Sequence, residues 1–476
     1  MPETCLTLCL NLRTGSVTQY GNYNFNSFIQ VGNRVFGLND AGLYSLDDND
    51  YDDTAQIPAF FKGPLTDFGS HFKKSWMKAY LGYQSKGNLA LTLSGDQHHW
   101  QTITFGTGFG EGHEQGALQP VERTKARYWQ AAIGNTNGCD FAVDSLKLQG
   151  QNGKPVLFFD KITGLNTRVN PVRITYGIKG AKAVCDLAEV LNCDIDDTGR
   201  ISRRKGFTLQ LAGSFHSGVS DGWTAYGILE GIGSGSLVKI NYDGSITTVA
   251  TGLTPNLPMN GAFAGGQFYW QNSMQQGVVS ASTANYPWVA IQPTASEIAS
   301  AARQFYSPPL TAGPMCSFEG RIFMVNQNVV WFTEWLSYNR VRLSVNFLQF
   351  ATPIPIFIPV KEGIWASDAH NIYFLRYEKA GPYPVFNRIQ VAAYPAIAGT
   401  GALAEPGQIL DGTLGNDPIA LFSTTHGICI GSGQGLFKNL TEEKIIFPYS
   451  MTGAGTVINR ANAPGMPIRY IVSLQP

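Results

Sequence analysis

The sequence predicts an all-β protein: a β-propeller of several four-stranded blades, interrupted by an inserted antiparallel β-sandwich. Three observations lead to this prediction. The 476 residues include 53 Gly and 25 Pro, and 12% of them are aromatic, which is typical of many short strands joined by tight turns. Hairpin-like phrases recur along the chain. In its second half they are spaced by about 50 residues, a period found among propeller repeats.

Each recurring phrase contains a short apolar run, a turn centred on Gly or Asn, and an aromatic-rich strand. Because apolar and polar residues alternate on both sides of the turn, each phrase is predicted to form a hairpin. A further hairpin is expected at the two-residue turn Asp243-Gly244, between VKINY and SITTVA. The turns predicted in the five phrases are Gly32-Asn33, Gly265-Gly266, Glu319-Gly320, His370-Asn371 and His426-Gly427.

The spacing of the phrases favours blades over a single pair of sheets. A blade cannot bury both of its faces alone, so blades pack side by side around an axis. We expect several blades from Gly261 onward, with residues 226–252 forming another. The alternative is a β-sandwich whose strands share turn chemistry by chance, and periodicity alone leaves it open.

Three regions are expected along the chain. Residues 1–57 begin the propeller, residues 58–157 form the inserted sandwich, and residues 158–476 supply the remaining blades and connecting loops. Within the insert, Leu89, Leu91 and Leu93 fall on one face of a predicted strand.

Two segments fall outside this β pattern. A short helix is expected from Ala295, in ASEIASAARQFY, as a connection between blades. The acidic segment Asp47–Asp53 is expected to be a solvated loop at the junction with the insert.

The charge balance limits the possible partners. Lys+Arg and Asp+Glu both total 34, so the formal net charge is zero, and only 14% of residues are charged. The chain lacks the excess of basic residues that would indicate nucleic-acid binding. A large, weakly charged surface tends to associate, so we expect neighbouring subunits to cover much of it.

The cysteines and apolar runs indicate a chain made in the cytosol. Seven scattered Cys fit reduced structural thiols better than a disulfide framework. The N-terminal segment lacks the pattern of a signal peptide, and the apolar run Pro353–Val360 contains three prolines, so no membrane span is expected.

No motif predicts catalysis, a cofactor or a metal. DIDDTGRISRR, from Asp194, resembles a calcium loop but has Lys205 where a bidentate Glu is required, so we interpret it as an acid-rich turn held by the neighbouring arginines. The tripeptide Asp197-Thr198-Gly199 occurs once, whereas aspartic-protease chemistry needs two acids. The seven His lack zinc-site spacing and are expected in cores or turns. We therefore expect a non-enzyme with no catalytic, cofactor-binding or metal-binding residues and no cofactor.

Part of the sequence resembles a family of bacteriophage virion proteins, the nozzle proteins of short-tailed phages. Three phrases carry the resemblance in order: NCDIDDTGRISRRKG (192–206), SFHSGVSDGW (214–223) and GLTPNLPMNGAFAGGQFYWQN (252–272). They lie within residues 184–287, roughly a fifth of the chain. Residues 23–47 and 127–148 are similar to segments of phage tail proteins more loosely.

The resemblance implies a structural tail subunit located in the virion. Such a subunit forms a homo-oligomeric ring, expected to be a hexamer, beside the portal, adaptor and other tail proteins. DNA passes through its channel during ejection without sequence-specific binding. Two alternatives remain: a tail protein that binds a host receptor or glycan through the insert, and a polysaccharide hydrolase with two carboxylates placed by the fold.

Overall fold

The structure is a computed structural model, and within the residues that it describes every element of regular secondary structure is a β-strand. It describes residues 5–96, 99–107, 114–117, 125–150, 153–174, 176–179, 182–290, 305–378, 384–409, 417–459 and 467–475. Within these ranges no helix is long and apolar enough to cross a membrane. The helix expected from Ala295 falls mostly on residues 291–304, outside the described part of the chain.

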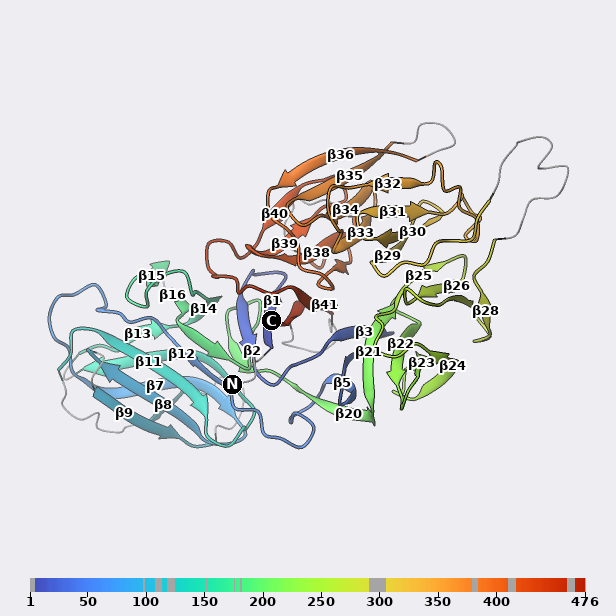
Figure 1. The fold of residues 1–476 in the computed structure, drawn as a ribbon. Helices are drawn as coiled ribbons and strands as arrows, with labels where there is room; N and C mark the ends of the chain where they lie inside the picture. Colours follow the sequence, from blue (N-terminus) through green and yellow to red (C-terminus); the bar gives the residue numbers. More distant parts are fainter. Residues whose placement is uncertain are drawn as a thin grey trace.

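Seven four-stranded antiparallel sheets account for most of the described strands, and we number them 1 to 7 (Figure 1). Sheet 1 joins opposite ends of the described chain, in the order β2 (Val17–Tyr20), β1 (Leu6–Asn11), β42 (Arg469–Gln475) and β41 (Thr452–Ile458). Sheet 2 contains β3 (Ser27–Val31), β4 (Arg34–Asn39), β5 (Gly42–Asn49) and β20 (Gly206–Ala212).

The other five of these sheets each use four strands in chain order. Sheet 3 contains β21 (Ser214–Ser220), β22 (Ala225–Glu230), β23 (Gly235–Ile240) and β24 (Ile246–Leu253). Sheet 4 contains β25 (Asn260–Ala264), β26 (Gln267–Gln271), β27 (Gln276–Val279) and β28 (Asn285–Pro287). Sheet 5 contains β29 (Met315–Phe318), β30 (Arg321–Asn326), β31 (Val329–Phe332) and β32 (Phe347–Gln349).

Sheets 6 and 7 complete the series. Sheet 6 contains β33 (Ile356–Val360), β34 (Gly363–Ser367), β35 (Ile372–Glu378) and β36 (Val385–Ala392). Sheet 7 contains β37 (Ala402–Ala404), β38 (Ile419–Thr424), β39 (Gly427–Gly431) and β40 (Phe437–Asn439).

The predicted hairpins are confirmed, but two turns are displaced by one residue. The turns at Gly32-Asn33, Gly265-Gly266 and Glu319-Gly320 each connect the first two strands of a sheet. In sheet 6, however, Asp368 N–H binds the Asn371 carbonyl, so the chain reverses at residues 369–370 rather than at His370-Asn371. In sheet 7, Gly427 is already paired with Thr424, so the chain reverses at residues 425–426 rather than at His426-Gly427.

Neighbouring sheets contact one another mainly through one edge strand each. This strand is β41 in sheet 1 and, in most of the other sheets, the first strand in chain order. These contacts run β41 to β3, β3 to β21, β21 to β25, β25 to β29, β29 to β33 and β33 to β38, and β37 in turn contacts β41. Apolar side chains fill the spaces between adjacent sheets, as where Tyr226 of sheet 3 stacks on Phe268 of sheet 4 at 4.3 Å between ring centroids.

The insert leaves sheet 2 after β5 and returns to it at β20, and it forms a lobe beside the other sheets (Figure 1). One of its sheets contains β10 (Glu114–Ala117), β7 (Trp76–Ser85), β12 (Phe141–Gly150), β19 (Ile201–Arg203), β18 (Cys193–Ile195) and β13 (Val156–Phe159). The second contains β17 (Glu189–Leu191), β6 (Phe60–Lys62), β11 (Trp129–Asn135), β8 (Leu89–Gly95) and β9 (His99–Phe105). A small third sheet contains β14 (Lys161–Leu165), β16 (Lys182–Leu187) and β15 (Tyr176–Lys179).

The insert extends beyond residue 157, where the sequence analysis placed its end. Strands up to Arg203 pair with insert strands, and the chain rejoins sheet 2 only at Gly206. Leu89, Leu91 and Leu93 are buried on one face, as predicted. The insert core continues into apolar side chains of sheets 1 and 7, so no solvent layer separates the lobe from these sheets.

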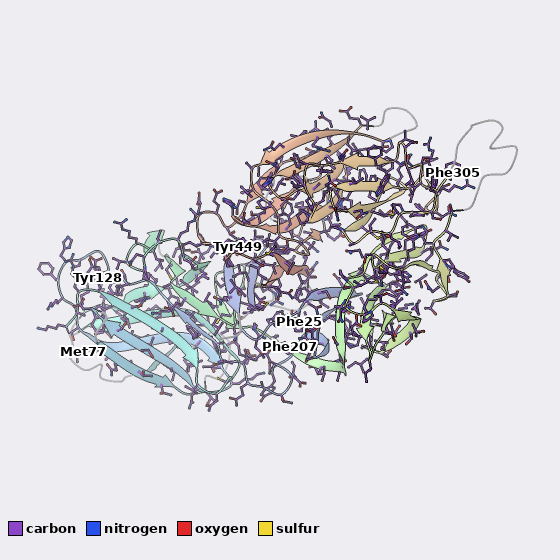
Figure 2. All side chains as sticks on the ribbon, viewed as in Figure 1. Phe25, Met77, Tyr128, Phe207, Phe305 and Tyr449 are labelled. Carbon is purple, nitrogen blue, oxygen red and sulfur yellow. The ribbon has the colours of Figure 1, made fainter. Side chains whose placement is uncertain are left out.

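An aromatic cluster lies where the insert rejoins sheet 2. Phe207 at the start of β20 contacts Phe25 at 5.4 Å and Tyr44 at 5.3 Å between ring centroids. Figure 2 shows Phe25 and Phe207 side by side in this region. Edge-to-face packing of this kind fixes the direction in which the chain leaves the insert.

Candidate functional site

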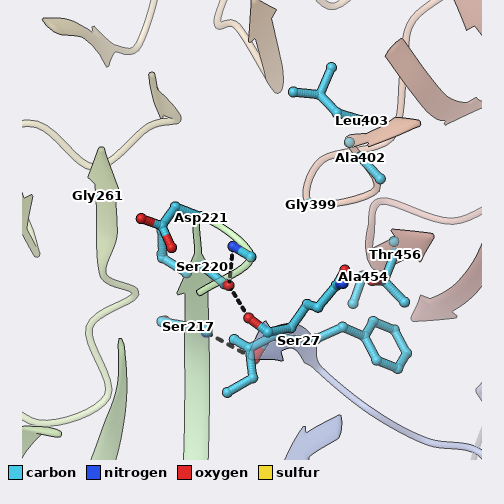
Figure 3. Close-up of a pocket in the computed structure, with 18 of the residues that line it drawn as sticks. Ser27, Ser217, Ser220, Asp221, Gly261, Gly399, Ala402, Leu403, Ala454 and Thr456 are labelled. Atoms are coloured by element: carbon cyan, nitrogen blue, oxygen red, sulfur yellow. Dashed lines mark hydrogen bonds between the residues drawn. The ribbon is translucent and has the colours of Figure 1, made fainter. Parts of the chain in front are cut away.

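An open cavity of about 1660 Å³ lies between β41 of sheet 1 and the first strands of the other six sheets (Figure 3). Every one of these sheets contributes to its wall. Representative lining residues, from sheet 1 to sheet 7, are Thr456, Ser27, Ser217, Gly261, Ser317, Ile358 and Ala402.

Small residues allow the sheets to approach one another at this wall. A Cβ atom at Gly455 of β41 would lie 2.2 Å from the carbonyl oxygen of Thr400, which precedes β37. Only hydrogen fits at that distance, so the close contact between sheets 7 and 1 requires glycine at this position.

The cavity wall mixes polar and apolar residues, and its described lining carries negative but no strongly basic side chains. Its carboxylates are Asp40, Asp221 and Glu405, and none of the described lining residues is Lys or Arg. The remaining polar groups are mostly hydroxyls and amides, including Gln30, Asn33, Ser217, Asn256 and Asn260.

A turn between β21 and β22 places Asp221 at the edge of the cavity. Its Oδ1 accepts hydrogen bonds from the backbone N–H groups of Trp223 (2.9 Å) and Thr224 (2.7 Å). The carbonyl of Gly222 accepts a hydrogen bond from Gly32 N–H at 2.7 Å. The turn of sheet 3 is therefore tied to the first turn of sheet 2.

Two exposed aromatic side chains border the same edge. Trp223 is 81% exposed and Tyr242, in the turn between β23 and β24, is 53% exposed. Tyr242 donates a hydrogen bond from Oη to Asn33 Oδ1 at 2.8 Å. The Arg34 guanidinium donates to the carbonyl of Tyr242 at 2.9 Å and lies 5.7 Å from the ring centroid.

A Ser–His–Glu contact also lies beside the cavity. His216 Nδ1 is 2.7 Å from Ser217 Oγ, and His216 Nε2 is 2.8 Å from Glu230 Oε1. Ser217 Oγ accepts a hydrogen bond from Met259 N–H, and Glu230 Oε1 accepts one from Asn256 N–H. Because both acceptors hold the segment before β25, the contact fastens sheet 4 to sheet 3. His216 was expected in a core or a turn; it is instead half-buried in β21, where it lines the cavity.

Apart from the groups at the cavity, a cluster of charged side chains is buried between sheet 1, sheet 2 and the insert. Arg469 Nη1 donates to Asp194 Oδ2 at 2.7 Å, and Nη2 donates to Asp47 Oδ2. The Tyr20 hydroxyl donates to Asp194 and accepts from Arg469. Burial alone would lower the pKa of Arg469, but the Asp194 and Asp47 carboxylates raise it well above its usual value. Burial, together with the nearby charge of Asp194, raises the pKa of the Cys9 thiol to about 12.

The prediction that Asp47–Asp53 is a solvated loop is wrong. Asp47 and Asp52 are both only 5% exposed. Asp52 forms a bidentate pair with Arg204, with oxygen-to-nitrogen distances of 2.7 and 2.6 Å. Acidic runs are usually solvated, but these carboxylates face arginines that the folded chain brings from distant strands, and such pairing offsets the cost of burial.

The acid-rich segment from Asp194 is held by arginines, as predicted, but these are distant in the sequence, whereas the neighbouring Arg203 and Arg204 pair with Asp50 and Asp52. Asp194 pairs with Arg469, and Asp197 pairs with Arg13 at 3.1 Å. Asp196 Oδ1 instead closes its own turn by accepting the N–H groups of Thr198 and Arg200. Among the residues that the structure describes, no group of three or more His, Cys, Asp or Glu could hold a metal ion.

Comparisons with known proteins identify no family for this chain. No family profile and no curated protein matches the sequence. The extracellular domain of a putative hybrid two-component system from B. thetaiotaomicron is 9% identical over 54% of this chain and 32% of its own, at a TM-score of 0.34. A putative 6-phosphogluconolactonase from Bacteroides fragilis is 8% identical over 76% of this chain and 96% of its own, at 0.31.

PorZ, a bacterial surface component of the type-IX secretion system of Porphyromonas gingivalis, is 10% identical over 96% of this chain and 76% of its own, at a TM-score of 0.27. This chain thus spans about a third of the length of the first of these structures. All three TM-scores lie below 0.5, so the argument about function depends on the chain's own residues.

Proposed function

We propose that the chain is a structural, non-enzymatic subunit of a bacteriophage tail, built on a seven-bladed β-propeller with a β-sandwich inserted in its second blade. In the proposed assembly it belongs to the nozzle ring, with six copies surrounding the channel for DNA ejection. The portal, adaptor and other tail proteins are its proposed neighbours.

The order of contacts between the sheets supports the propeller. Each of the seven sheets touches the next, the seventh touches the first, and one strand of each sheet lines the same cavity. Pairing of β1 with β42 within sheet 1 would close the ring of blades. Two facing sheets, the alternative considered from the sequence, would not give this order of contacts.

The observation that carries the structural role is the rigid attachment of the insert. Arg469 of sheet 1 binds carboxylates of both sheet 2 and the insert, and the insert shares a continuous core with sheets 1 and 7. A subunit that must keep its shape under the pressure of DNA passage needs such an attachment. A recognition domain that reaches for a receptor would instead need a flexible linker, without buried ion pairs or a shared core.

The surface suits assembly. Only 14% of residues are charged, and large apolar side chains are exposed at several separate places. Exposed apolar groups on a weakly charged protein mark surfaces that partners cover. Examples are Phe72, Trp335, Ile446, Tyr449 and Met451.

The phrases that resemble nozzle proteins fall on elements with structural roles. Residues 192–206 form the return from the insert, residues 214–223 contain β21 beside the cavity, and residues 252–272 contain β25 and β26. A resemblance concentrated on the attachment of the insert and on the cavity wall is expected if family members share a framework.

Immunogold microscopy of phage particles that contain this chain tests the proposal. Antibodies raised against residues 67–74, an insert loop whose Phe72 is 82% exposed, should label the tail below the capsid vertex. Labelling of the capsid surface, or a chain absent from purified particles, would overturn the proposal. The same particles labelled against the portal provide the control for position.

A further inference from the structure

The edge of the cavity at sheets 2 and 3 presents two aromatic rings that the proposed tail role does not use. Trp223 and Tyr242 are both exposed, although each belongs to a turn with several fixed hydrogen bonds. Exposed tryptophan is costly on a surface that nothing covers, so this edge is a candidate binding surface.

The rings are held in place before any ligand arrives. Asp221 fixes the backbone of the Trp223 turn, and Gly32 N–H binds the carbonyl of Gly222 from the adjacent sheet. Tyr242 is held by Asn33 at its hydroxyl and by Arg34 at its carbonyl. Binding to a preordered aromatic surface loses little conformational entropy.

The charge of the surroundings selects the class of ligand. Asp40, Asp221 and Glu405 are the carboxylates among the described lining residues, and no lysine or arginine is among them. With three carboxylates in the lining against the single guanidinium of Arg34 beside Tyr242, the surroundings disfavour nucleic acids and sulfated or phosphorylated polymers. They accept a neutral ligand rich in hydroxyl groups, since carboxylates and amides both accept hydroxyl hydrogen bonds.

We propose that this edge binds a neutral glycan. The apolar face of a pyranose ring stacks on Trp223, Tyr242 supports a neighbouring unit, and hydroxyl groups bind polar side chains at the cavity mouth. Asp221 is suited to this role because its Oδ2 takes no part in the hydrogen bonds that Oδ1 makes to the turn. The amides of Gln30 and Asn256 line the same cavity.

The proposal differs from glycan binding by the insert, because both rings belong to sheet 3. It also does not depend on the tail assignment. A chain that bound glycan here without entering a tail would leave this proposal intact, and a tail subunit that bound no glycan would leave the proposed function intact.

A glycan array of neutral and anionic oligosaccharides, probed with the full chain, tests the proposal. The neutral oligosaccharide with the strongest signal is then titrated by calorimetry against the wild type and two variants. Trp223→Ala should weaken binding at least about tenfold, as expected for loss of a central aromatic contact. Trp335→Ala, which removes a 65% exposed tryptophan outside the cavity lining, should leave affinity unchanged.

Three outcomes would overturn the proposal. They are an array with no signal from neutral glycans, a preference for anionic glycans, and equal affinity of wild type and Trp223→Ala. Circular dichroism of each variant verifies folding. If Trp223→Ala disrupts self-association while the wild type binds no glycan, the edge is a contact between copies and the glycan proposal is wrong.

Discussion

Single charged residues determine how the parts of this protein are held together. Arg469 lies in the apolar strand β42 with its side chain buried, and it pairs with two buried carboxylates from different regions. Asp47 adopts a left-handed backbone conformation, with φ of 57°, at the point where it meets this arginine. An uncommon backbone conformation at a non-glycine residue is maintained only where its surroundings compensate for it.

Removing the arginine should therefore destabilise the whole chain. Arg469→Met keeps the volume but leaves Asp47 and Asp194 buried without their cation. We expect the free energy of unfolding to fall by about 3–5 kcal/mol, as for other broken buried ion pairs. Urea unfolding followed by tryptophan fluorescence measures the change. The control is Arg13→Met, which removes a partly exposed pair with Asp197 and should cost about 0–1 kcal/mol. Equal losses in the two variants would contradict this account.

Stability should also depend on acid pH at the insert attachment. Burial alone would raise the pKa of Asp50, but hydrogen bonds from Lys205 and Lys86 hold it well below its ordinary value. Because the folded-state pKa is lowered, this contribution is present above about pH 4, the ordinary carboxyl pKa, and is lost as pH falls below it.

The urea midpoint measured at pH 7 and at pH 3 tests this dependence. The wild type should lose more stability on acidification than Asp50→Asn, which cannot titrate at this position. If the two proteins lose the same amount, Asp50 makes no contribution to acid sensitivity.

At the scale of strands and sheets, local pairing was predictable and distant pairing was not. Turn residues such as Gly32-Asn33 and Gly265-Gly266 specify their hairpins within a few residues, so the sequence predicts them correctly. Sheet 1 pairs β1 with β42 from opposite ends of the described chain, and no local signal records that pairing. The insert boundary at residue 157 failed to capture β14 to β19 for the same reason, because their partners are distant or short strands.

At the candidate site, too, local features were predictable from the sequence and contacts between distant residues were not. His216 was expected in a core or a turn, but it lies half-buried in β21, and its partner Glu230 in the next strand was not identified. An arginine within the apolar run PIRYIVSL was a readable sign that Arg469 has buried partners. The aromatic edge was not predictable, because Trp223 and Tyr242 occur in ordinary turn sequences and only the fold places both beside the cavity.

The close contact between sheets 7 and 1 gives a prediction at this scale. Gly455→Ala would place a Cβ atom 2.2 Å from the Thr400 carbonyl oxygen, so the two sheets must separate. We expect the free energy of unfolding to fall by about 1–3 kcal/mol. Gly106→Ala, with nothing within 4 Å of the added carbon, is the matched control and should change it by less than about 0.5 kcal/mol. Chemical denaturation of both variants measures the two changes. Equal, small changes would mean that sheets 7 and 1 are loosely packed at Gly455.

At the scale of the whole molecule, the seven sheets and the insert are joined by continuous contacts, and the surface carries exposed apolar side chains. Seven sheets contact one another in order, and the insert is attached by buried ion pairs and a shared core. The chain has no net charge to oppose self-association. Rigid shape and weak self-repulsion are the properties that a repeated subunit of a ring requires.

The central claim is that the seven sheets close into a propeller and that this propeller is a ring subunit of the tail. Cryo-electron microscopy of tails isolated from particles that contain the chain tests both parts directly. The account predicts a ring of six copies, each with a wheel of seven blades and the insert as a fixed lobe beside it. Tails without such a ring, or subunits whose seven sheets form an open arc rather than a wheel, would contradict it.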